Sequence, residues 1–163
     1  MFPIEGKKIL PVDHLVIESL SVRGGLGGMT VWVSKEDEGM TLDINDWIKV
    51  YDGQHSPSWR KFVELKFDTK IKLRAGQVRG VYVHSSLPGD QGLIYDNQKD
   101  QFTHRDNFIT VHPGYAHVCN KPFGKTTMWG YGTPWRDRRE FVGKVSIAAL
   151  ISLIFNYDSL YNL

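Results

Sequence analysis

Apolar and polar residues alternate along several short stretches of the chain, and a period of two is typical of half-buried β-strands. The stretch 29–34 is one example, because Met29, Val31 and Val33 share one face while Trp32 lies on the other. A strand of this kind covers a core with one face only. It therefore predicts a sheet packed on one side.

The same alternation recurs at intervals along most of the chain. Further strands are predicted at 15–22, 62–67, 70–74, 78–84, 93–95, 108–111 and 141–147. In the first of these, the apolar parity changes between Ile17 and Leu20, which predicts a β-bulge. Clusters of glycine and proline separate the stretches, as turns require. The pattern predicts an all-β fold, a jelly-roll-like antiparallel β-sandwich, as a single domain over 1–163.

Three stretches depart from this alternation. Residues 34–46 are acidic and predict a short helix or a long loop, whereas 51–59 reads as a surface loop with an aromatic residue at each end. The last residues, 151–163, are compatible with a strand or with a short amphipathic C-terminal helix.

Composition and charge narrow the classes of protein. The chain has 163 residues and a formal net charge of +2, which is too small to indicate nucleic-acid binding. Its longest apolar run, 145–155, has eleven residues, and a membrane-spanning helix needs about 20. The one cysteine, Cys119, cannot form an internal disulfide, and the first residues lack the apolar stretch of a signal peptide. These features predict a soluble, intracellular protein of a reducing compartment, with no membrane span.

One short motif carries candidate metal chemistry. Pro113, Gly114, His117 and Asn120 have the spacing Pro-Gly-x-x-His-x-x-Asn. This resembles the second metal-binding motif of cupins, and the resemblance implies a jelly-roll fold and a divalent metal. In the region of that family's first motif the chain offers His84. His84 and His117 are therefore the candidate metal ligands.

A third ligand for such a metal would have to be Asp90 or His112. The alternative is that the Pro-Gly pair makes a turn and that the nitrogens of His117 are satisfied by local hydrogen bonds. Without a metal, no cofactor is expected.

A second constellation, the aromatic–basic segment 121–144, interleaves aromatic residues with arginines. Such residues anchor protein partners, because they supply large contact area at low entropic cost. The predicted binding residues are Trp129, Tyr131, Trp135, Arg136, Arg138 and Arg139. Alternatively, the tryptophans plug the end of the sandwich and the arginines are solvated or paired with acidic loops.

Two functional hypotheses follow. The first is a non-catalytic β-sandwich module, or small accessory subunit, that binds a protein partner through the aromatic–basic segment. The second is a cupin-like metal-dependent enzyme or small-molecule binder that uses His84 and His117. Carbohydrate binding through Trp47, Trp59 or Trp129 is a third reading, which rests on aromatic content alone.

Overall fold

The computed structural model describes residues 1–8, 12–35, 40–127 and 129–151, and these form an almost entirely β fold. The strands are β1 (Phe2–Gly6), β2 (Val12–Gly24), β3 (Gly27–Ser34), β4 (Trp47–His55), β5 (Ser58–Arg74), β6 (Val78–Ser85), β7 (Tyr95–Asn97), β8 (His104–Arg105), β9 (Ile109–Val111), β10 (Gly114–His117), β11 (Trp135–Phe141) and β12 (Lys144–Ile151). A 3-10 turn, Ile44–Asp46, precedes β4. The predicted all-β class is confirmed.

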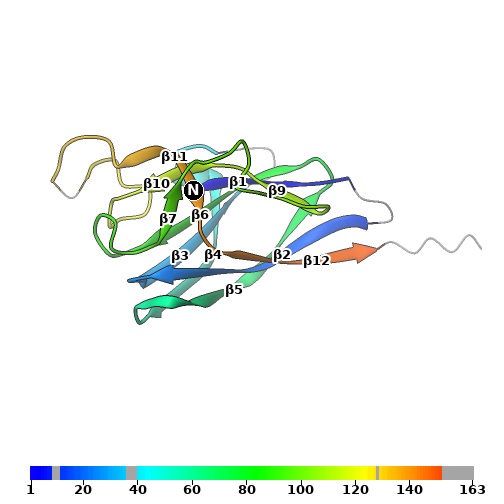
Figure 1. Cartoon of the computed structure of the whole chain (residues 1–163), viewed down its shortest axis with the longest axis horizontal. Coiled ribbons are helices and arrows are strands. Elements are labelled where there is room, and N and C mark those ends of the chain that lie inside the picture. Colours follow the sequence, from blue (N-terminus) through cyan, green and yellow to red (C-terminus); the bar gives the residue numbers. More distant parts are fainter. Residues whose placement is uncertain (9–11, 36–39, 128, 152–163) are drawn as a thin grey trace, which may run out of the picture.

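The strands form three antiparallel sheets. The largest has the order β4-β3-β6-β1-β9-β8, the second β12-β2-β5 and the third β10-β11-β7. The first two sheets form the layers of a sandwich, and the third lies across one end of it (Figure 1). Among the described residues, no helix is long and apolar enough to cross a membrane.

The core lies between the first two sheets and is built from the apolar residues of the alternating pattern. Met29, Val31 and Val33 of β3 are completely buried, and Leu65 and Leu73 of β5 face them from the other layer. Each of these side chains gains about 25 cal/mol for every Å² of apolar surface removed from water. The alternation therefore predicted the buried faces of both sheets correctly.

The predicted bulge in β2 is also confirmed. The register between β2 and β5 shifts between Ile17 and Ser19, and the register with β12 shifts opposite the same residues. The shift returns both Ile17 and Leu20 to the core, where each is at most 1% exposed. A regular strand would have placed one of them in solvent.

Three predicted boundaries were wrong. The segments 62–67 and 70–74 belong to one strand, β5. Its apolar core residues stay at odd-numbered positions from Val63 to Leu73. Residues 51–59 are not a loop: they form the end of β4 and the start of β5, where the chain crosses from the first sheet to the second. The polar residues of β4 are tolerated because it is an edge strand with one face in solvent.

The predicted strand 141–147 is in fact two strands that belong to different sheets. Phe141 pairs with Tyr95 at the end of β11, whereas Lys144 pairs with Ser21 at the start of β12. The chain changes sheet at Gly143, where an added Cβ would lie 2.2 Å from the ring of Phe141. The alternative of a C-terminal helix concerns 151–163. Ile151 is the last residue of β12, and the rest of that segment lies outside the described residues.

Candidate functional site

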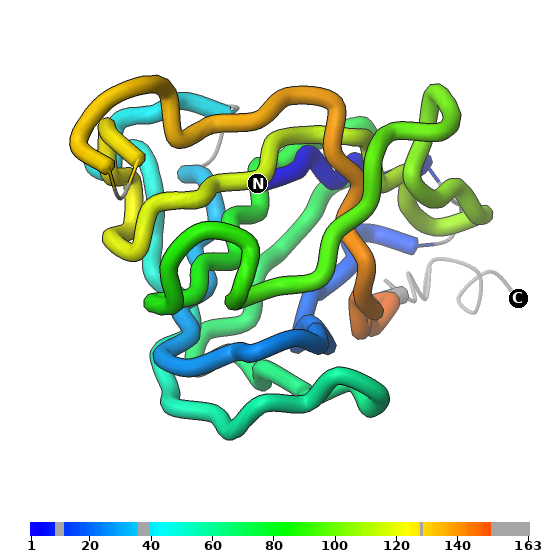
Figure 2. Tube along the Cα trace, turned by 60° about the vertical axis from the view of Figure 1, so that its left-hand side comes forward, coloured from blue at the N-terminus to red at the C-terminus, as the bar shows by residue number. Residues whose placement is uncertain are grey.

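Two long connections, 86–94 and 118–134, gather beside the third sheet, and together they are called the loop end. Figure 2 shows these green and yellow-to-orange segments on the same side of the molecule. Main-chain hydrogen bonds join them: the N–H of Gly89 donates to the oxygen of Val118, and the N–H of Val118 donates to that of Pro134. These bonds join the two connections to each other and hold the 118–134 connection beside the start of β11.

Tyr82 of β6 anchors the loop end from below. Its side chain is fully buried, and its hydroxyl donates to Nδ1 of His117 over 2.7 Å. The Nε2–H of His117 in turn donates to the main-chain oxygen of Gly124 over 3.0 Å. The ring of Trp135 stacks on His117 with centroids 4.0 Å apart. One buried phenol therefore holds His117, and through it the 118–134 connection.

His84 lies beside this chain of hydrogen bonds. It is 4% exposed, its Nε2 donates to the main-chain oxygen of Cys119 over 3.0 Å, and its ring centroid lies 5.9 Å from that of His117. The two predicted metal ligands are therefore neighbours. Cys119 itself is buried, as a small apolar residue would be.

The surroundings of His117 favour a structural role over metal ligation. Both of its ring nitrogens are engaged in hydrogen bonds, so neither has a lone pair free for a metal. Of the other candidate ligands, Asp90 is bound by Arg136, and Nε2 of His112 lies 3.3 Å from a carboxylate oxygen of Glu5. In the part of the chain that the structure describes, no group of three or more His, Cys, Asp or Glu side chains is placed to hold a metal ion.

Burial makes both histidines poor bases. Desolvation lowers the pKa of His117 to about 4, and it lowers the pKa of His84 as well. At neutral pH the two imidazoles are therefore uncharged. This matches a neutral His117 that accepts a hydrogen bond from Tyr82 at Nδ1 and donates one from Nε2.

This shift predicts a pH dependence of stability. Because the ordinary pKa of 6.5 exceeds the folded value of about 4, the unfolded chain takes up the proton first as the pH falls. The His117 contribution is fully present above pH 6.5. Between about pH 6.5 and 4 the free energy of unfolding should fall by about 2 kcal/mol, allowing for the partial exposure of the ring. Urea unfolding at a series of pH values measures it.

The control for this prediction is a pair of variants. His117→Gln should remove the part of the fall in the free energy of unfolding that His117 causes, and the part caused by His84 should remain. His104→Gln, a substitution at an exposed position, should leave the whole fall in place. An acid profile unchanged by His117→Gln would contradict the assignment.

The predicted binding residues of the aromatic–basic segment separate into two groups. Trp129 and Tyr131 are 71% and 75% exposed and lie at the tip of the 118–134 connection. Trp135 is half-buried under the loop, where its stack on His117 gives it a packing role. The packing reading therefore holds for Trp135, whereas Trp129 and Tyr131 stay predicted binding residues.

The tip that carries Trp129 and Tyr131 is held by local hydrogen bonds. The N–H of Gly130 donates to the main-chain oxygen of Thr127, and the hydroxyl of Thr127 donates to that of Tyr131 over 2.5 Å. Gly130 and Gly132 have φ values of 78° and 77°, a conformation that favours glycine. The two aromatic side chains thus extend from a defined turn.

The three arginines also separate. Arg136 donates from Nη1 to both carboxylate oxygens of Asp90, over 2.9 and 2.8 Å, and to the hydroxyl oxygen of Tyr95. The hydroxyl of Tyr95 donates to Asp90 over 2.6 Å. Arg138 is exposed, and Arg139 is half-buried. Arg136 thus ties β11 to the 86–94 connection through Asp90, whereas Arg139 bonds only to main-chain oxygens of β11 among the described contacts.

A bulge in β11 sets the directions of these arginines. Gly114 pairs with Arg139 and Ala116 with Arg136, so three steps on β11 oppose two on β10. Arg138 takes up the extra residue with a φ of 54°. Residues three apart on a regular strand face opposite sides, but the extra residue brings Arg136 and Arg139 to the same side.

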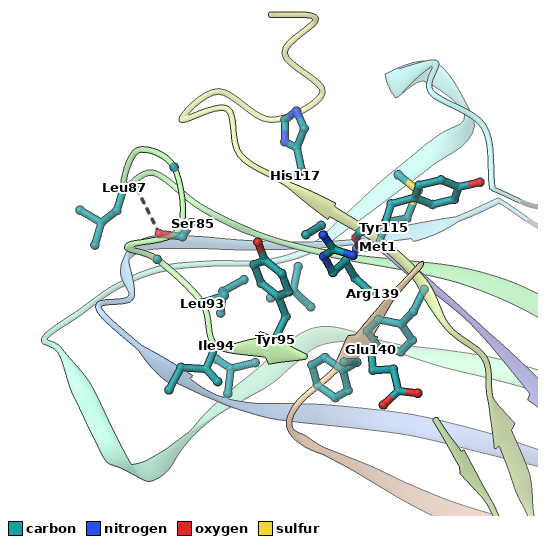
Figure 3. Close-up of a pocket in the computed structure, with 17 residues that line it drawn as sticks. Met1, Ser85, Leu87, Leu93, Ile94, Tyr95, Tyr115, His117, Arg139 and Glu140 are labelled. Carbon is teal, nitrogen blue, oxygen red and sulfur yellow. Dashed lines mark hydrogen bonds between the residues drawn. The ribbon is translucent and has the colours of Figure 1, made fainter. Parts of the chain in front are cut away.

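A hollow opens between the third sheet and the 86–94 connection, and Figure 3 shows it in close-up. Its free volume is about 70 Å³, well below the roughly 300–1,000 Å³ of typical small-molecule sites. Its lining includes Leu87, Leu93, Tyr95, His117 and Arg139. Members of both sequence-based site predictions, His117 and Arg139, thus border one space.

Sequence reasoning missed Tyr82 and Tyr95, whose hydroxyls join the strands to the loop end. Tyr82 follows the apolar Val81 in a strand predicted to be half-buried, and nothing nearby marks its hydroxyl as a donor. Tyr95 is separated from Arg136 by 41 positions, so only the fold brings the two together.

Comparisons of the chain with protein-family models, with curated proteins and with solved structures find no match.

Proposed function

We propose that this protein is a non-catalytic β-sandwich module, or a small accessory subunit, that binds a protein partner through the tip of the loop end. The observation that carries this proposal is the exposure of Trp129 and Tyr131, at 71% and 75%. Two large aromatic side chains in solvent lose contact with water only when a partner covers them. Such residues dominate the binding energy of protein interfaces.

The base under this exposed aromatic pair supports the proposal. Tyr82, His117 and Trp135 form a packed, hydrogen-bonded layer beneath the loop, and two glycines shape the turn itself. A recognition loop held in one conformation loses less entropy on binding. Arg138 adds an exposed positive charge on β11, the strand that follows the loop. The partner surface is therefore expected to be apolar at its centre, with acidic groups at its rim.

The test compares variants in the capture and affinity of a protein partner. Immobilised protein captures proteins from an extract of its source cells, and each one is then purified and titrated calorimetrically. Trp129→Ala and Tyr131→Ala should each weaken binding by about 30-fold, the loss typical of a central aromatic contact. Both should change the free energy of unfolding by less than about 0.5 kcal/mol, because the side chains are exposed.

Trp59→Ala is the matched control. Trp59 is also an exposed tryptophan, 55% accessible, but it lies on β5 in a different sheet. Its replacement should leave partner affinity unchanged. If every captured protein bound the Trp129 and Tyr131 variants as tightly as the unchanged chain, the exposed aromatic pair would not be the binding surface.

A further inference from the structure

We propose that the outer face of the second sheet, β12-β2-β5, docks on an anionic lipid membrane surface through its lysines and arginines. This goes beyond the proposed protein-binding surface, which lies at the loop end. Figure 1 shows the second sheet along the lower side of the molecule, apart from β10 and β11 of the third sheet. A membrane on this face would therefore leave the loop end accessible.

Positive charge is concentrated on β5. The whole chain has a formal net charge of +2, but β5 alone has six lysine and arginine residues against two acidic ones, a net charge of +4. The rest of the chain is therefore slightly acidic in sum. Charge of one sign gathered on one element produces a local positive potential, although the protein as a whole is nearly neutral.

The direction of the side chains places lysines on the outer face of the sheet. Leu65 and Leu73 of β5 point into the core, so the even-numbered Lys66 and Lys72 point outward, and both are exposed. In the described part of the chain, neither lysine lies within ion-pair distance of a carboxylate. Their charges are therefore available to a partner.

Small side chains lie beside these lysines. Ser19 of β2 is the register partner of Lys66, and Ser146 of β12 is the register partner of Ser19. Ala148 lies two residues further along β12, on the same face. The centre of the face is therefore low, and the lysines stand above it. Because lysine side chains are long and flexible, several of them can reach one flat charged surface together.

Two more cations meet at Phe62, near the start of β5. Arg23 of β2 and Lys144 of β12 each lie over the ring of Phe62, 5.4 Å from its centroid. A cation–π contact positions a cation without cancelling its charge. These two residues therefore extend the positive surface across all three strands of the sheet.

The acidic residues of this face cancel only part of its positive charge. Lys70 pairs with Glu18 over 2.6 Å, and those two charges offset each other. Glu64 and Asp68 are exposed and contribute two negative charges. The cations that remain outnumber them: Arg23, Lys66, Lys72 and Lys144. The face is therefore positive in sum, which suits an anionic partner.

Exposed apolar side chains favour a membrane over a nucleic acid as that partner. Leu150 is 49% exposed at the end of β12, and Phe62 is 38% exposed. Binding to a membrane surface increases with the apolar area buried among the headgroups and with the attraction to anionic lipids. Single-stranded nucleic acid instead needs free aromatic rings on which its bases stack, and the ring of Phe62 already contacts two cations.

The experiment measures binding to lipid vesicles by cosedimentation. Phosphatidylcholine vesicles with about 30% phosphatidylserine are compared with vesicles of phosphatidylcholine alone, because only the former have a negative surface potential. The protein should bind the anionic vesicles saturably and the neutral ones at least about 10-fold more weakly. Salt at about 0.5 M should release it, since the charges are then screened within a few Å.

Two double variants separate this face from general charge attraction. Lys66→Gln with Lys72→Gln should weaken binding about 25-fold, which is about 5-fold for each lysine near an anionic surface. Lys121→Gln with Lys125→Gln is the matched control, because it removes the same charge from two exposed lysines of the loop end. It should leave the affinity for vesicles unchanged. Circular dichroism shows that each double variant is folded.

Three outcomes would overturn the proposal. The first is equal binding to anionic and neutral vesicles, and the second is an equal loss of binding in the two double variants. The third concerns a short DNA duplex as a competing polyanion. If the duplex bound more tightly than the anionic vesicles and lost affinity in the Lys66 and Lys72 variant, the face would be a nucleic-acid surface instead.

Discussion

Replacing Tyr82 by alanine is expected to lower the free energy of unfolding by about 4 kcal/mol, the cost of removing a large buried aromatic side chain. Tyr82 is fully buried, and its ring lies 4.7 Å from Phe123 and 5.7 Å from Trp135 between centroids. Its loss would leave a cavity that these rings cannot fill without moving the 118–134 connection. Urea unfolding measures the stability, and near-ultraviolet circular dichroism reports the packing of the aromatic residues.

Tyr82→Phe separates the hydroxyl from the ring. It should cost about 1–2 kcal/mol, because Nδ1 of His117 loses its donor while the packing is kept. His117→Gln in the Tyr82→Phe background should then cost less than it does alone, since the two groups share one hydrogen bond. A loss below about 1 kcal/mol for Tyr82→Ala would mean that the 118–134 connection does not depend on this anchor.

The sandwich could be predicted from the sequence because its signal is local. The side chains of a strand alternate between core and solvent. The burial of residues such as Val31 and Leu65 can therefore be inferred from the residues immediately before and after them. Even the bulge near Ile17 left a trace, since it shifts the apolar parity. By contrast, the edge strand β4 escaped notice, because it buries little and carries polar residues.

The candidate site was predicted only in part, because its contacts are non-local. The sequence predicted Trp129 and Tyr131 as binding residues, and the structure shows that both are exposed. It could not distinguish them from Trp135, which packs on a histidine brought from another strand. Nor could it reveal the hollow, whose arginine is directed by a bulge at Arg138 that no residue pattern marks. Such features depend on which strands the fold places side by side.

A second large effect is expected where the 86–94 connection meets the end of β2. Gly24→Ala should lower the free energy of unfolding by about 3 kcal/mol, the sum of backbone strain and overpacking. Gly24 has a φ of 144°, and an added Cβ would lie 2.4 Å from the main-chain oxygen of Gly92. That oxygen accepts the N–H of Leu26, so it cannot move away without breaking a hydrogen bond.

Gly76→Ala is the matched control, because it adds the same methyl group at a positive φ, 74°, with nothing within 4 Å. It should cost about 1 kcal/mol, the price of backbone strain alone. Urea unfolding gives both values, and their difference measures the close approach of the two main chains. Hydrogen exchange at Leu26 and Ile94 should quicken in the Gly24 variant only, since these amides bond the two segments together. Equal losses in the two variants would show that the 86–94 connection yields freely, and a wall of the hollow would then be adjustable instead of fixed.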